Sequence, residues 1–456
     1  MKESTSVPRL FGTNGVRGIV NSKEMDCQFA LRLGLAIGTF MKGTVVIGTD
    51  ARTSNEMLKS ACASGLMATG CMVQDCGIVP TPTVQYAVKV GRAAGGVMIT
   101  ASHNPPEFNG IKCIDPDGTE MSRENEENIE AIYHKGSFAR AEWREMGRMS
   151  PHATSIERYI GGILAKVDVI KIRRAGLRIA VDCGNGAASQ VTPRLLARLG
   201  VKSVTLNADM NGAFPGHESE PTPENTTDLI ELVKSGGFDF GVIHDGDADR
   251  SVFVDENGRY LHGDRSLAIV AHHICKQKPG RLVVTNVASS KCVEDAVKTA
   301  GGSVLYTRVG SPIIARAMME KGGVFGGEEN GGLIFADFQY CRDGAMAVAK
   351  MLEIVASEGK LSKLNDAIPA YSQYKTKTKC PDSEKARVLA ELAASSGRDR
   401  VDTTDGVKIY QKEGWVLVRP SGTEPIFRIF SESDSPDKSK ELAESYKKRV
   451  EKLVRG

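Results

Sequence analysis

Residues 100–106 are Thr100-Ala101-Ser102-His103-Asn104-Pro105-Pro106, and the apolar run before them predicts a short buried strand over 96–99. The two prolines stiffen the segment, and the first also restricts the residue before it. Asn109-Gly110 is typical of a tight turn, with a second strand expected over 111–114. A hydroxyl on a stiff loop at a strand end suits a nucleophile, although the same residues could merely satisfy backbone groups in a turn.

Length and composition indicate a globular protein of three or four domains, because 456 residues are too many for one core. The chain is 41% hydrophobic and 25% charged, which is ordinary for a soluble protein. Its net charge of +3 argues against a nucleic-acid partner or a membrane-surface role.

The chain lacks the features of a secreted or membrane protein. No apolar segment follows residues 1–5, so we expect no signal peptide, and Lys42 interrupts the best candidate for a membrane span. The ten cysteines form no CxxC pair and fit neither a zinc site nor a disulfide framework. A reducing, cytoplasmic location is the simplest interpretation.

Alternation of apolar runs with helical patterns predicts an α/β fold for the first 370 residues. Three successive α/β units each end a strand in a polar loop. From about Tyr371 the pattern changes to paired strands followed by an amphipathic helix over 436–454, which predicts a smaller α+β domain. The charged segment 120–150 is expected to be helical and exposed, and one helix is expected over 155–168. Strands are expected over 45–48, 73–79, 177–181, 203–206, 238–243, 281–285, 303–306, 407–410, 415–418 and 427–430.

The strongest local pattern is Asp245-Gly246-Asp247-Ala248-Asp249, directly after an expected strand. In an extended backbone the alternation would point three carboxylates the same way, and their mutual repulsion calls for a cation. Ligands that are all oxygen favour Mg²⁺ or Ca²⁺. An EF-hand would place Glu256 at its twelfth position, but Arg250 stands where that loop needs glycine. A solvated acidic turn without a metal is the other alternative.

Three further loops carry candidate binding groups. Residues 11–18 place glycines around Arg17, which allows close approach to a ligand. Residues 328–332, Glu-Glu-Asn-Gly-Gly, offer acceptors and a donor to a polyhydroxylated ligand. Residues 419–423, Arg-Pro-Ser-Gly-Thr, offer a guanidinium, hydroxyls and backbone N–H groups to an anion such as phosphate. Each loop could also be a plain structural turn.

Taken together, these loops favour phosphoryl transfer on a sugar phosphate. An acyl-transfer triad is disfavoured because Ser102 lacks the GxSxG context, and a P-loop is excluded because its GK[ST] ending is absent.

The chain closely resembles the α-D-phosphohexomutase family, and most of all its archaeal-type branch. The resemblance rests on four motifs in the family order: TASHNP (100–105), DGDADR (245–250), GEENGG (327–332) and RPSGTEP (419–425). It implies three related α/β domains with mixed sheets and a smaller C-terminal α+β domain around a central cleft. The implied boundaries are 1–152 with the phosphoserine loop, 153–257 with the metal loop, 258–370 with the sugar loop and 371–456 with the phosphate loop.

The resemblance also implies an activity. A phosphoryl group would move between the 1- and 6-positions of a hexose phosphate by way of a phosphoserine and a hexose 1,6-bisphosphate, which is an intermediate and activator. The expected substrate is a hexose phosphate, with no nucleic-acid or membrane partner, and the expected state is a monomer or weak homodimer. Phosphoglucosamine mutase activity is favoured. The alternatives are a bifunctional phosphomannomutase/phosphoglucomutase, a Mg²⁺-dependent sugar phosphatase and a non-catalytic sugar-phosphate-binding protein.

The residues implied by the resemblance fall into three groups. The phosphoserine at Ser102 would join Asp245, Asp247 and Asp249 in holding one Mg²⁺. The catalytic group would be Ser102, Lys112, Arg17 and His103. The substrate-binding group would be Glu328, Asn330, Arg419, Ser421, Gly422, Thr423, Arg428 and Arg250. The proton acceptor would be Lys112 if neighbouring cations favour its neutral form, with His103 as the second candidate.

The chain departs from the family pattern in the sugar loop. Many relatives have a histidine where Gly332 stands, and some also have one at the position of Ser311. A histidine general acid therefore cannot be carried over, which leaves more of the proton transfer to Lys112. The hydroxyls that Glu328 and Asn330 would bind are common to glucose, mannose and glucosamine, so these residues do not identify the sugar.

Overall fold

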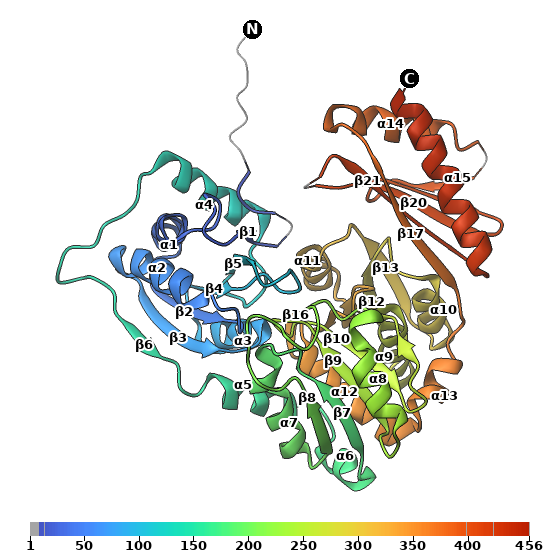
Figure 1. Ribbon diagram of the computed structural model, residues 1–456, viewed down its shortest axis with the longest axis horizontal. Coiled ribbons are helices and arrows are strands. Elements are labelled where there is room, and N and C mark those ends of the chain that lie inside the picture. Colours follow the sequence, from blue (N-terminus) through green and yellow to red (C-terminus); the bar gives the residue numbers. More distant parts are fainter. Residues whose placement is uncertain (1–8, 13, 398, 423, 456) are drawn as a thin grey trace. The chain divides into compact units, whose positions relative to one another are not determined.

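The computed structural model describes residues 9–12, 14–397, 399–422 and 424–455. The chain forms two compact units: residues 1–266 with 330–364, and residues 267–329 with 365–456. Two complete sheets lie in the first unit and one complete sheet lies in the second (Figure 1). Across the part of the chain that the structure describes, every helix is too short or too polar to cross a lipid bilayer.

The first sheet is mixed and has the order β1-β5-β4-β2-β3-β6. Strands β4, β2, β3 and β6 run parallel, whereas β5 pairs antiparallel with β1 and β4. Helices α1, α2 and α4 cover one face and α3 covers the other, so apolar cores form on both sides. The bounds are β1 (Val16–Ile19), α1 (Cys27–Met41), β2 (Thr44–Thr49), α2 (Asn55–Ala68), β3 (Met72–Ile78), α3 (Thr81–Gly91), β4 (Gly95–Ile99), β5 (Phe108–Ile114), α4 (Arg123–Lys135) and β6 (Met149–Pro151).

Two expectations for this region were wrong. Asn109 and Gly110 form no turn but lie inside β5, opposite Gly18 and Arg17 of β1. Pairing with two neighbouring strands outweighs the local turn preference of this dipeptide. The charged segment 120–150 is helical only in α4, which ends at Gly136 in the left-handed conformation (φ 68°).

The second sheet has the order β11-β10-β9-β7-β8, with β7 parallel to both β8 and β9. Strands β10 and β11 pair antiparallel as a hairpin. The expected helix over 155–168 is confirmed as α5, which ends earlier, at Leu164. A second helix, α6, follows, and Asp168 caps it by accepting from the Lys171 N–H (2.9 Å). The bounds are α5 (Ser155–Leu164), α6 (Val169–Ala175), β7 (Arg178–Asp182), η1 (Ala187–Gln190), α7 (Thr192–Leu199), β8 (Lys202–Leu206), η2 (Glu224–Thr226), α8 (Thr227–Lys234), β9 (Phe240–His244), β10 (Ser251–Asp255) and β11 (Tyr260–Leu261).

The next segment contributes to both units. In the second unit, β12 runs parallel to β13 on one side and β14 on the other. In the first unit, β15 and β16 form an antiparallel hairpin, and α12 packs on α5 and α6. The bounds are α9 (Gly263–Gln277), β12 (Leu282–Asn286), α10 (Lys291–Thr299), β13 (Ser303–Thr307), α11 (Ser311–Lys321), β14 (Phe325–Gly327), β15 (Leu333–Phe335), β16 (Gln339–Arg342), α12 (Gly344–Glu358) and α13 (Leu361–Asp366).

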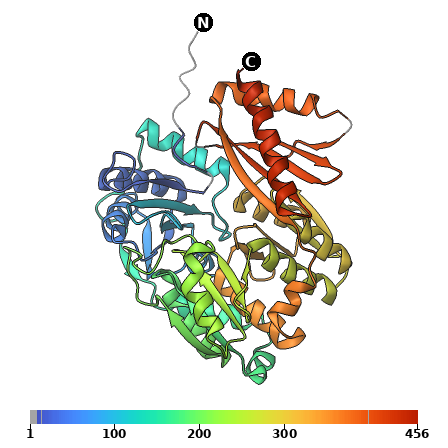
Figure 2. The ribbon, with the colours of Figure 1, turned by 45° about the vertical axis from the view of Figure 1, so that its right-hand side comes forward.

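The C-terminal sheet is antiparallel throughout, in the order β17-β21-β20-β19-β18. Helix α15 lies across one face of it, as Figures 1 and 2 both show, and buries an apolar core with α14. This arrangement confirms the smaller α+β fold expected for the end of the chain. The bounds are β17 (Ser372–Lys379), α14 (Asp382–Ala394), β18 (Arg400–Asp402), β19 (Val407–Gln411), β20 (Gly414–Pro420), β21 (Ile426–Ser433) and α15 (Pro436–Arg455).

Candidate active site

The serine loop leaves the carboxyl end of β4, a strand that is buried along its whole length. Ser102 is buried and adopts a left-handed conformation (φ 53°), which is uncommon for a residue with a side chain. Its N–H donates to Thr100 Oγ1 (2.8 Å), and its carbonyl accepts from Ser219 Oγ (3.2 Å). Its hydroxyl donates to Asp245 Oδ2 over 2.9 Å. The loop therefore holds this hydroxyl in one direction, towards the acidic cluster.

Arg52 anchors the serine loop from the end of the neighbouring strand β2. Its guanidinium is buried and donates to four backbone carbonyls, those of Ser102, Asn104, Pro105 and Phe108. It also pairs with Asp50 Oδ2 over 3.2 Å. Burial raises the pKa of the Asp50 carboxyl, and the charge of Arg52 works against this rise. The sequence analysis missed Arg52, although an Asp-x-Arg step at the end of a parallel strand is a detectable signal.

The three aspartates follow β9 in a tight turn, not in an extended segment. The Ala248 N–H donates to the Asp245 carbonyl (3.0 Å), and Ala248 is left-handed (φ 53°). The prediction that these carboxylates converge is confirmed, but the extended backbone proposed for it was wrong. One oxygen from each of Asp245, Asp247 and Asp249 lies within 4.8 Å of the others, and all three residues are buried.

Gly246 lets the acidic turn approach the serine loop. A Cβ atom at this position would lie 2.6 Å from Ser219 Oγ and 2.7 Å from the Ser102 carbonyl oxygen. Neither distance is possible without movement of one of the two loops. Glycine is therefore required here by close packing, because it is the residue without a Cβ atom.

Cations surround the acidic cluster. Lys112 of β5 lies 2.6 Å from Asp247 Oδ2 and 3.6 Å from Asp249 Oδ2. Arg250 Nε lies 2.9 Å from Asp245 Oδ2, and Arg342 Nη2 lies 2.6 Å from Asp249 Oδ2. These pairs offset part of the repulsion among the carboxylates.

The carboxylates differ in their protonation. Burial raises the pKa of Asp245 to about 7, against Arg250 and with the help of the charges on Asp249 and Asp247. Burial also acts to raise the pKa of Asp247, but the charge and hydrogen bond of Lys112 outweigh it and hold that pKa below its usual range. Asp245 therefore has a pKa close to neutral pH, whereas Asp247 is ionised at that pH.

The acidic cluster fits a magnesium ion. Among the described residues, Asp247 Oδ1 and Asp249 Oδ1 are buried and have no hydrogen-bond partner. Buried carboxylate oxygens of this kind are costly unless a cation binds them. Three carboxylates also supply the hard oxygen ligands that Mg²⁺ prefers.

His103 and Arg17 lie beside the serine. His103 Nδ1 is 3.4 Å from Ser102 Oγ and 3.6 Å from Glu220 Oε2. Burial, with help from Arg250, lowers the pKa of His103 well below its usual value, so the imidazole is neutral at pH 7. Arg17 Nη1 donates to Asn104 Oδ1 over 2.8 Å. The first unit therefore brings together every predicted catalytic and metal-binding residue.

Glu220 was not predicted from the sequence. Its two carboxylate oxygens lie 2.8 and 3.2 Å from the two terminal nitrogens of Arg250. The charge of Arg250 lowers the pKa of Glu220, although burial acts to raise it. A glutamate in the loop before α8 carries no distinguishing pattern, so only the folded chain reveals its place.

The sugar-loop residues fall in different units. In the second unit Glu328 is buried, and its Oε1 accepts from the Gly310 N–H over 3.2 Å. In the first unit Asn330 Oδ1 accepts from the Gly332 N–H over 3.1 Å. A Cβ atom at Gly332 would collide with the side chain of Arg342. The space that a side chain at position 332 would need is therefore filled by an arginine stem.

The predicted phosphate loop links β20 to β21 in the second unit. The Ser421 N–H donates to the Ile426 carbonyl (3.0 Å), and Ser421 Oγ accepts from the Glu424 N–H (3.2 Å). Lys385 Nζ donates to the carbonyls of Ser421 and Glu424. Gly422 lies in the same turn, whereas Thr423 lies outside the described residues.

Three cations share one row of the C-terminal sheet. Arg419 of β20 stands directly opposite Arg428 of β21, and Arg428 stands opposite Lys377 of β17. Like charges directly opposite each other destabilise a sheet. Such a row is favourable where an anion binds, which supports the prediction of a phosphate site.

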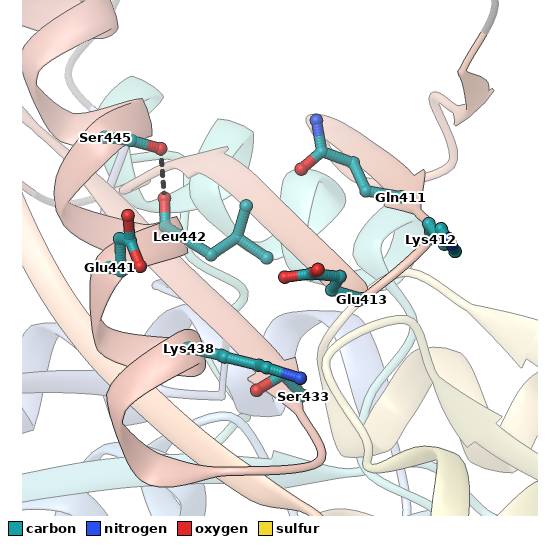
Figure 3. A pocket seen from close by; sticks show the side chains of 8 residues that line it. All are labelled: Gln411, Lys412, Glu413, Ser433, Lys438, Glu441, Leu442 and Ser445. Atoms are coloured by element: carbon teal, nitrogen blue, oxygen red, sulfur yellow. Dashed lines mark hydrogen bonds between the residues drawn. The ribbon is translucent and has the colours of Figure 1, made fainter.

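The C-terminal sheet also carries a separate pocket of about 420 Å³ between the β19–β20 turn and α15. Figure 3 shows Gln411 at the end of β19, Lys412 and Glu413 on the turn, and Lys438, Glu441, Leu442 and Ser445 on the helix. Residues of both charges line this pocket. No predicted site residue is among its lining residues, so it is distinct from the phosphate loop.

Comparisons with known proteins agree with the four-motif resemblance. Models of phosphoglucomutase/phosphomannomutase domains match in order: domain I at 8–140, domain II at 157–258, domain III at 262–371 and the C-terminal domain at 376–448. A phosphoglucomutase/phosphomannomutase from Thermococcus kodakarensis is 48% identical, over 98% of this chain and all of that protein. A probable phosphoglucosamine mutase from Methanopyrus kandleri is 42% identical, over 98% of each chain.

A solved structure gives the same picture. The crystal structure of a phosphoglucomutase/phosphomannomutase family protein from Burkholderia thailandensis superposes with a TM-score of 0.88 and 27% identity, covering 98% of each chain. The sequence matches therefore point to the same family as the fold. The mixed sheets and the cluster of serine, aspartates and cations agree with that assignment. This chain belongs to the phosphoglucomutase/phosphomannomutase family.

Proposed function

We propose that the chain is a phosphohexomutase that moves a phosphoryl group between the 1- and 6-positions of a hexose phosphate, with Ser102 as its phosphoserine. The observation that carries this proposal is the buried Ser102 hydroxyl, 2.9 Å from Asp245 Oδ2 in a cluster of three aspartates. A hydroxyl held against a cation-binding cluster suits phosphoryl transfer, because that chemistry depends on positioning and charge neutralisation.

The first half-reaction transfers the phosphoryl group from the enzyme to the sugar. The free hydroxyl oxygen of the sugar attacks phosphorus, the bond from phosphorus to Ser102 Oγ breaks, and the hydroxyl proton passes to a base. The product is a hexose 1,6-bisphosphate. After it turns around, Ser102 Oγ attacks the other phosphoryl group, the bond from that phosphorus to the sugar oxygen breaks, and the sugar oxygen takes up the proton held by the base. The enzyme is then again in its phosphoserine form.

The metal site would be Asp245, Asp247, Asp249 and the phosphoserine oxygen, with one Mg²⁺. When bound, that ion supplies charge neutralisation for the transferring phosphoryl group. Lys112, Arg17 and Arg250 would contribute fixed positive charge around it. Arg17 and Arg250 keep this charge at any physiological pH.

Two residues are candidates for the base. Lys112 Nζ is engaged in an ion pair with Asp247 Oδ2 over 2.6 Å. The His103 imidazole lies 3.4 Å from Ser102 Oγ and is neutral. The geometry therefore favours His103 as the base, whereas the sequence favoured Lys112. A larger fall in kcat in His103→Gln than in Lys112→Met would identify the imidazole as the base. The reverse order would identify the lysine.

For the substrate we favour glucosamine 6-phosphate and glucosamine 1-phosphate, because the Methanopyrus kandleri relative is named a probable phosphoglucosamine mutase. The bifunctional alternative is supported by the Thermococcus kodakarensis relative, which is named a phosphoglucomutase/phosphomannomutase. In this proposal Glu328 and Asn330 bind the sugar hydroxyls, and Arg419, Ser421, Gly422, Thr423 and Arg428 hold the distal phosphate. Coupled assays of kcat/KM with glucosamine, mannose and glucose phosphates separate the two specificities.

The remaining alternatives give different products. A Mg²⁺-dependent phosphatase would release free phosphate without isomerisation, and a binding protein would bind the sugar phosphate unchanged. Intact-mass measurement after incubation with hexose 1,6-bisphosphate provides the key test. A phosphate-sized increment in the wild type that disappears in Ser102→Ala supports the mutase, whereas full mutase activity in Ser102→Ala overturns it.

The proposal extends to the protein's organisation and setting. We retain the domain boundaries 1–152, 153–257, 258–370 and 371–456, a monomer or weak homodimer, and a location in the cytoplasm. Sedimentation equilibrium over a range of protein concentrations tests the assembly state.

A further inference from the structure

Asp405 is a carboxylate that no motif identified, and it touches two functional segments of the second unit. It lies in the turn between β18 and β19. Its Oδ2 atom is 3.0 Å from Arg419 Nε in the phosphate loop strand, and it accepts from the Val309 N–H over 3.1 Å. The next residue, Gly406, is left-handed (φ 85°), and a Cβ atom there would collide with the Val418 carbonyl. The backbone therefore fixes Asp405 close to β20.

The loop after β13 connects this carboxylate to the sugar loop. Two consecutive N–H groups of that loop donate to two different carboxylates: Val309 to Asp405 and Gly310 to Glu328. The two N–H groups belong to successive peptide planes that meet at the Val309 Cα, so both carboxylates hold the same short stretch of backbone. A displacement of Asp405 is therefore transmitted to the side chain proposed to bind the sugar.

Asp405 also orients Arg419. The carboxylate forms an ion pair with Nε, on one side of the planar guanidinium, over 3.0 Å. The two terminal N–H₂ groups form the fork that binds phosphate oxygens in pairs. Arg419 and Asp405 are both largely buried, with side-chain exposures of 19% and 14%. The ion pair keeps the Arg419 guanidinium beside Asp405 before any phosphate arrives.

The charge of Asp405 has a second consequence. Arg419 belongs to the row of three cations that also contains Arg428 and Lys377. Without a neighbouring carboxylate, Arg419 would be repelled by Arg428 and would turn towards solvent. Asp405 keeps it at the sheet surface while leaving the row net positive.

We propose that Asp405 is a positioning residue that sets Arg419 for the distal phosphate of the substrate and couples it, through Val309 and Gly310, to Glu328. This inference rests on the proposed mutase function. Phosphate binding in the C-terminal domain and hydroxyl binding by the sugar loop are then linked within one unit. Such coupling between two binding groups typically changes affinity by about 5- to 150-fold.

The test uses two variants of the full-length enzyme. Asp405→Ala removes both contacts, and we expect KM for the hexose phosphate to rise by about tenfold or more, with kcat changed less. Asp405→Asn keeps an acceptor for the Val309 N–H but loses the charge beside Arg419, so its KM should rise by an intermediate factor. Asp402→Ala is the matched control, because Asp402 ends β18, three residues before Asp405, but accepts from the Thr404 N–H (2.8 Å). Its KM should stay at the wild-type value.

A double-mutant cycle with Glu328→Gln separates positioning from simple loss of stability. Coupling predicts that the effects of Asp405→Ala and Glu328→Gln on KM are not additive, whereas a merely structural Asp405 would lower Tm and leave the two effects additive. An unchanged KM in a folded Asp405→Ala variant overturns the inference.

Calorimetric titration with inorganic phosphate keeps the test independent of the mutase assay. Weaker phosphate binding by Asp405→Ala than by the wild type supports the orientation of Arg419 even if the wild type shows no mutase activity. Equal phosphate binding by the two proteins counts against it. Absence of mutase activity in the wild type would instead contradict the proposed function.

Discussion

At the scale of single residues, Arg342 distinguishes this site from those of relatives with a histidine at position 332. Its stem fills the space above Gly332, and its guanidinium lies 2.6 Å from Asp249 Oδ2 and 3.6 Å from Glu120 Oε1. The sequence showed only that no imidazole stands at position 332. The structure shows that a permanent cation occupies that space instead. A cation there adds to the charge balance around the three aspartates but cannot act as a proton donor at neutral pH.

Truncation of Arg342 should therefore slow the chemical step. In Arg342→Ala we expect kcat to fall by about 10²- to 10³-fold, because a fixed charge beside the transferring group is lost. Gly332→Ala should reduce kcat by about tenfold, since its new methyl group displaces the arginine stem. In Gly332→Ala/Arg342→Ala the second change should add nothing, because the stem is already absent. Steady-state kinetics of the three variants measure this, and additive losses would show that the two positions act separately.

At the scale of loops and strands, the serine loop is held by contacts that differ greatly in strength. Arg52 donates to four of its carbonyls, whereas Ser219 donates to one. Arg52→Lys keeps the positive charge but loses the planar fork, so we expect kcat to fall about 100-fold as the loop loosens. Ser219→Ala should cost only about 1 kcal/mol and leave kcat within a fewfold of wild type. Equal kcat losses in the two variants would contradict this ranking.

A histidine–aspartate pair holds the loop that supplies Ser219 and Glu220. His217 Nε2 lies 3.2 Å from Asp182 Oδ1 at the end of β7. Burial acts to lower the pKa of His217, but the hydrogen bond and charge of Asp182 outweigh it and raise that pKa. For Asp182, burial acts to raise the pKa, and His217 with its other donors lowers it.

The pair should make stability depend on pH in a defined direction. The histidine contribution is complete below its unfolded pKa, near 6.5, and is lost as pH rises through the higher folded value. The aspartate contribution is present above about pH 4 and is lost on further acidification. Between these limits we expect His217→Gln to lower Tm by about 2 °C, with the difference disappearing at pH 8.5. Calorimetry at pH 5.5 and 8.5 checks this, and an equal Tm difference at both values would exclude the pair.

How far the sequence could predict these elements depended on the range of the interactions. The apolar runs before Thr100 and Asp245 correctly predicted strands β4 and β9, because burial of a strand is visible in its own residues. Asn109-Gly110 misled because pairing with β1 decides its conformation. Glu220, Arg342 and Asp405 act through partners far away in the sequence, so nothing local distinguishes them from surface charges. Arg52 differs, because its pairing with Asp50 leaves a local Asp-x-Arg signal.

At the scale of the whole molecule, the division into two compact units separates the proposed metal site from the phosphate loop. Asp245, Asp247 and Asp249 lie in the unit formed by 1–266 and 330–364, whereas Arg419 lies in the other. A ligand stabilises only the part of a protein that it binds. Magnesium and inorganic phosphate should therefore act on different unfolding transitions if the two units unfold separately.

Calorimetric scans can test this separation. Addition of Mg²⁺ to metal-free enzyme should raise the Tm of one transition. At a hundredfold excess over Kd, the ion should increase the free energy of unfolding of that unit by about 3 kcal/mol. Inorganic phosphate should raise the other. Asp247→Asn should abolish the Mg²⁺ response, because it removes one of the three carboxylates of the proposed metal site. The phosphate response should remain, because the phosphate loop is untouched. A Mg²⁺ response that survives in Asp247→Asn would show that the ion binds elsewhere, since the cluster then keeps only two of its three carboxylates.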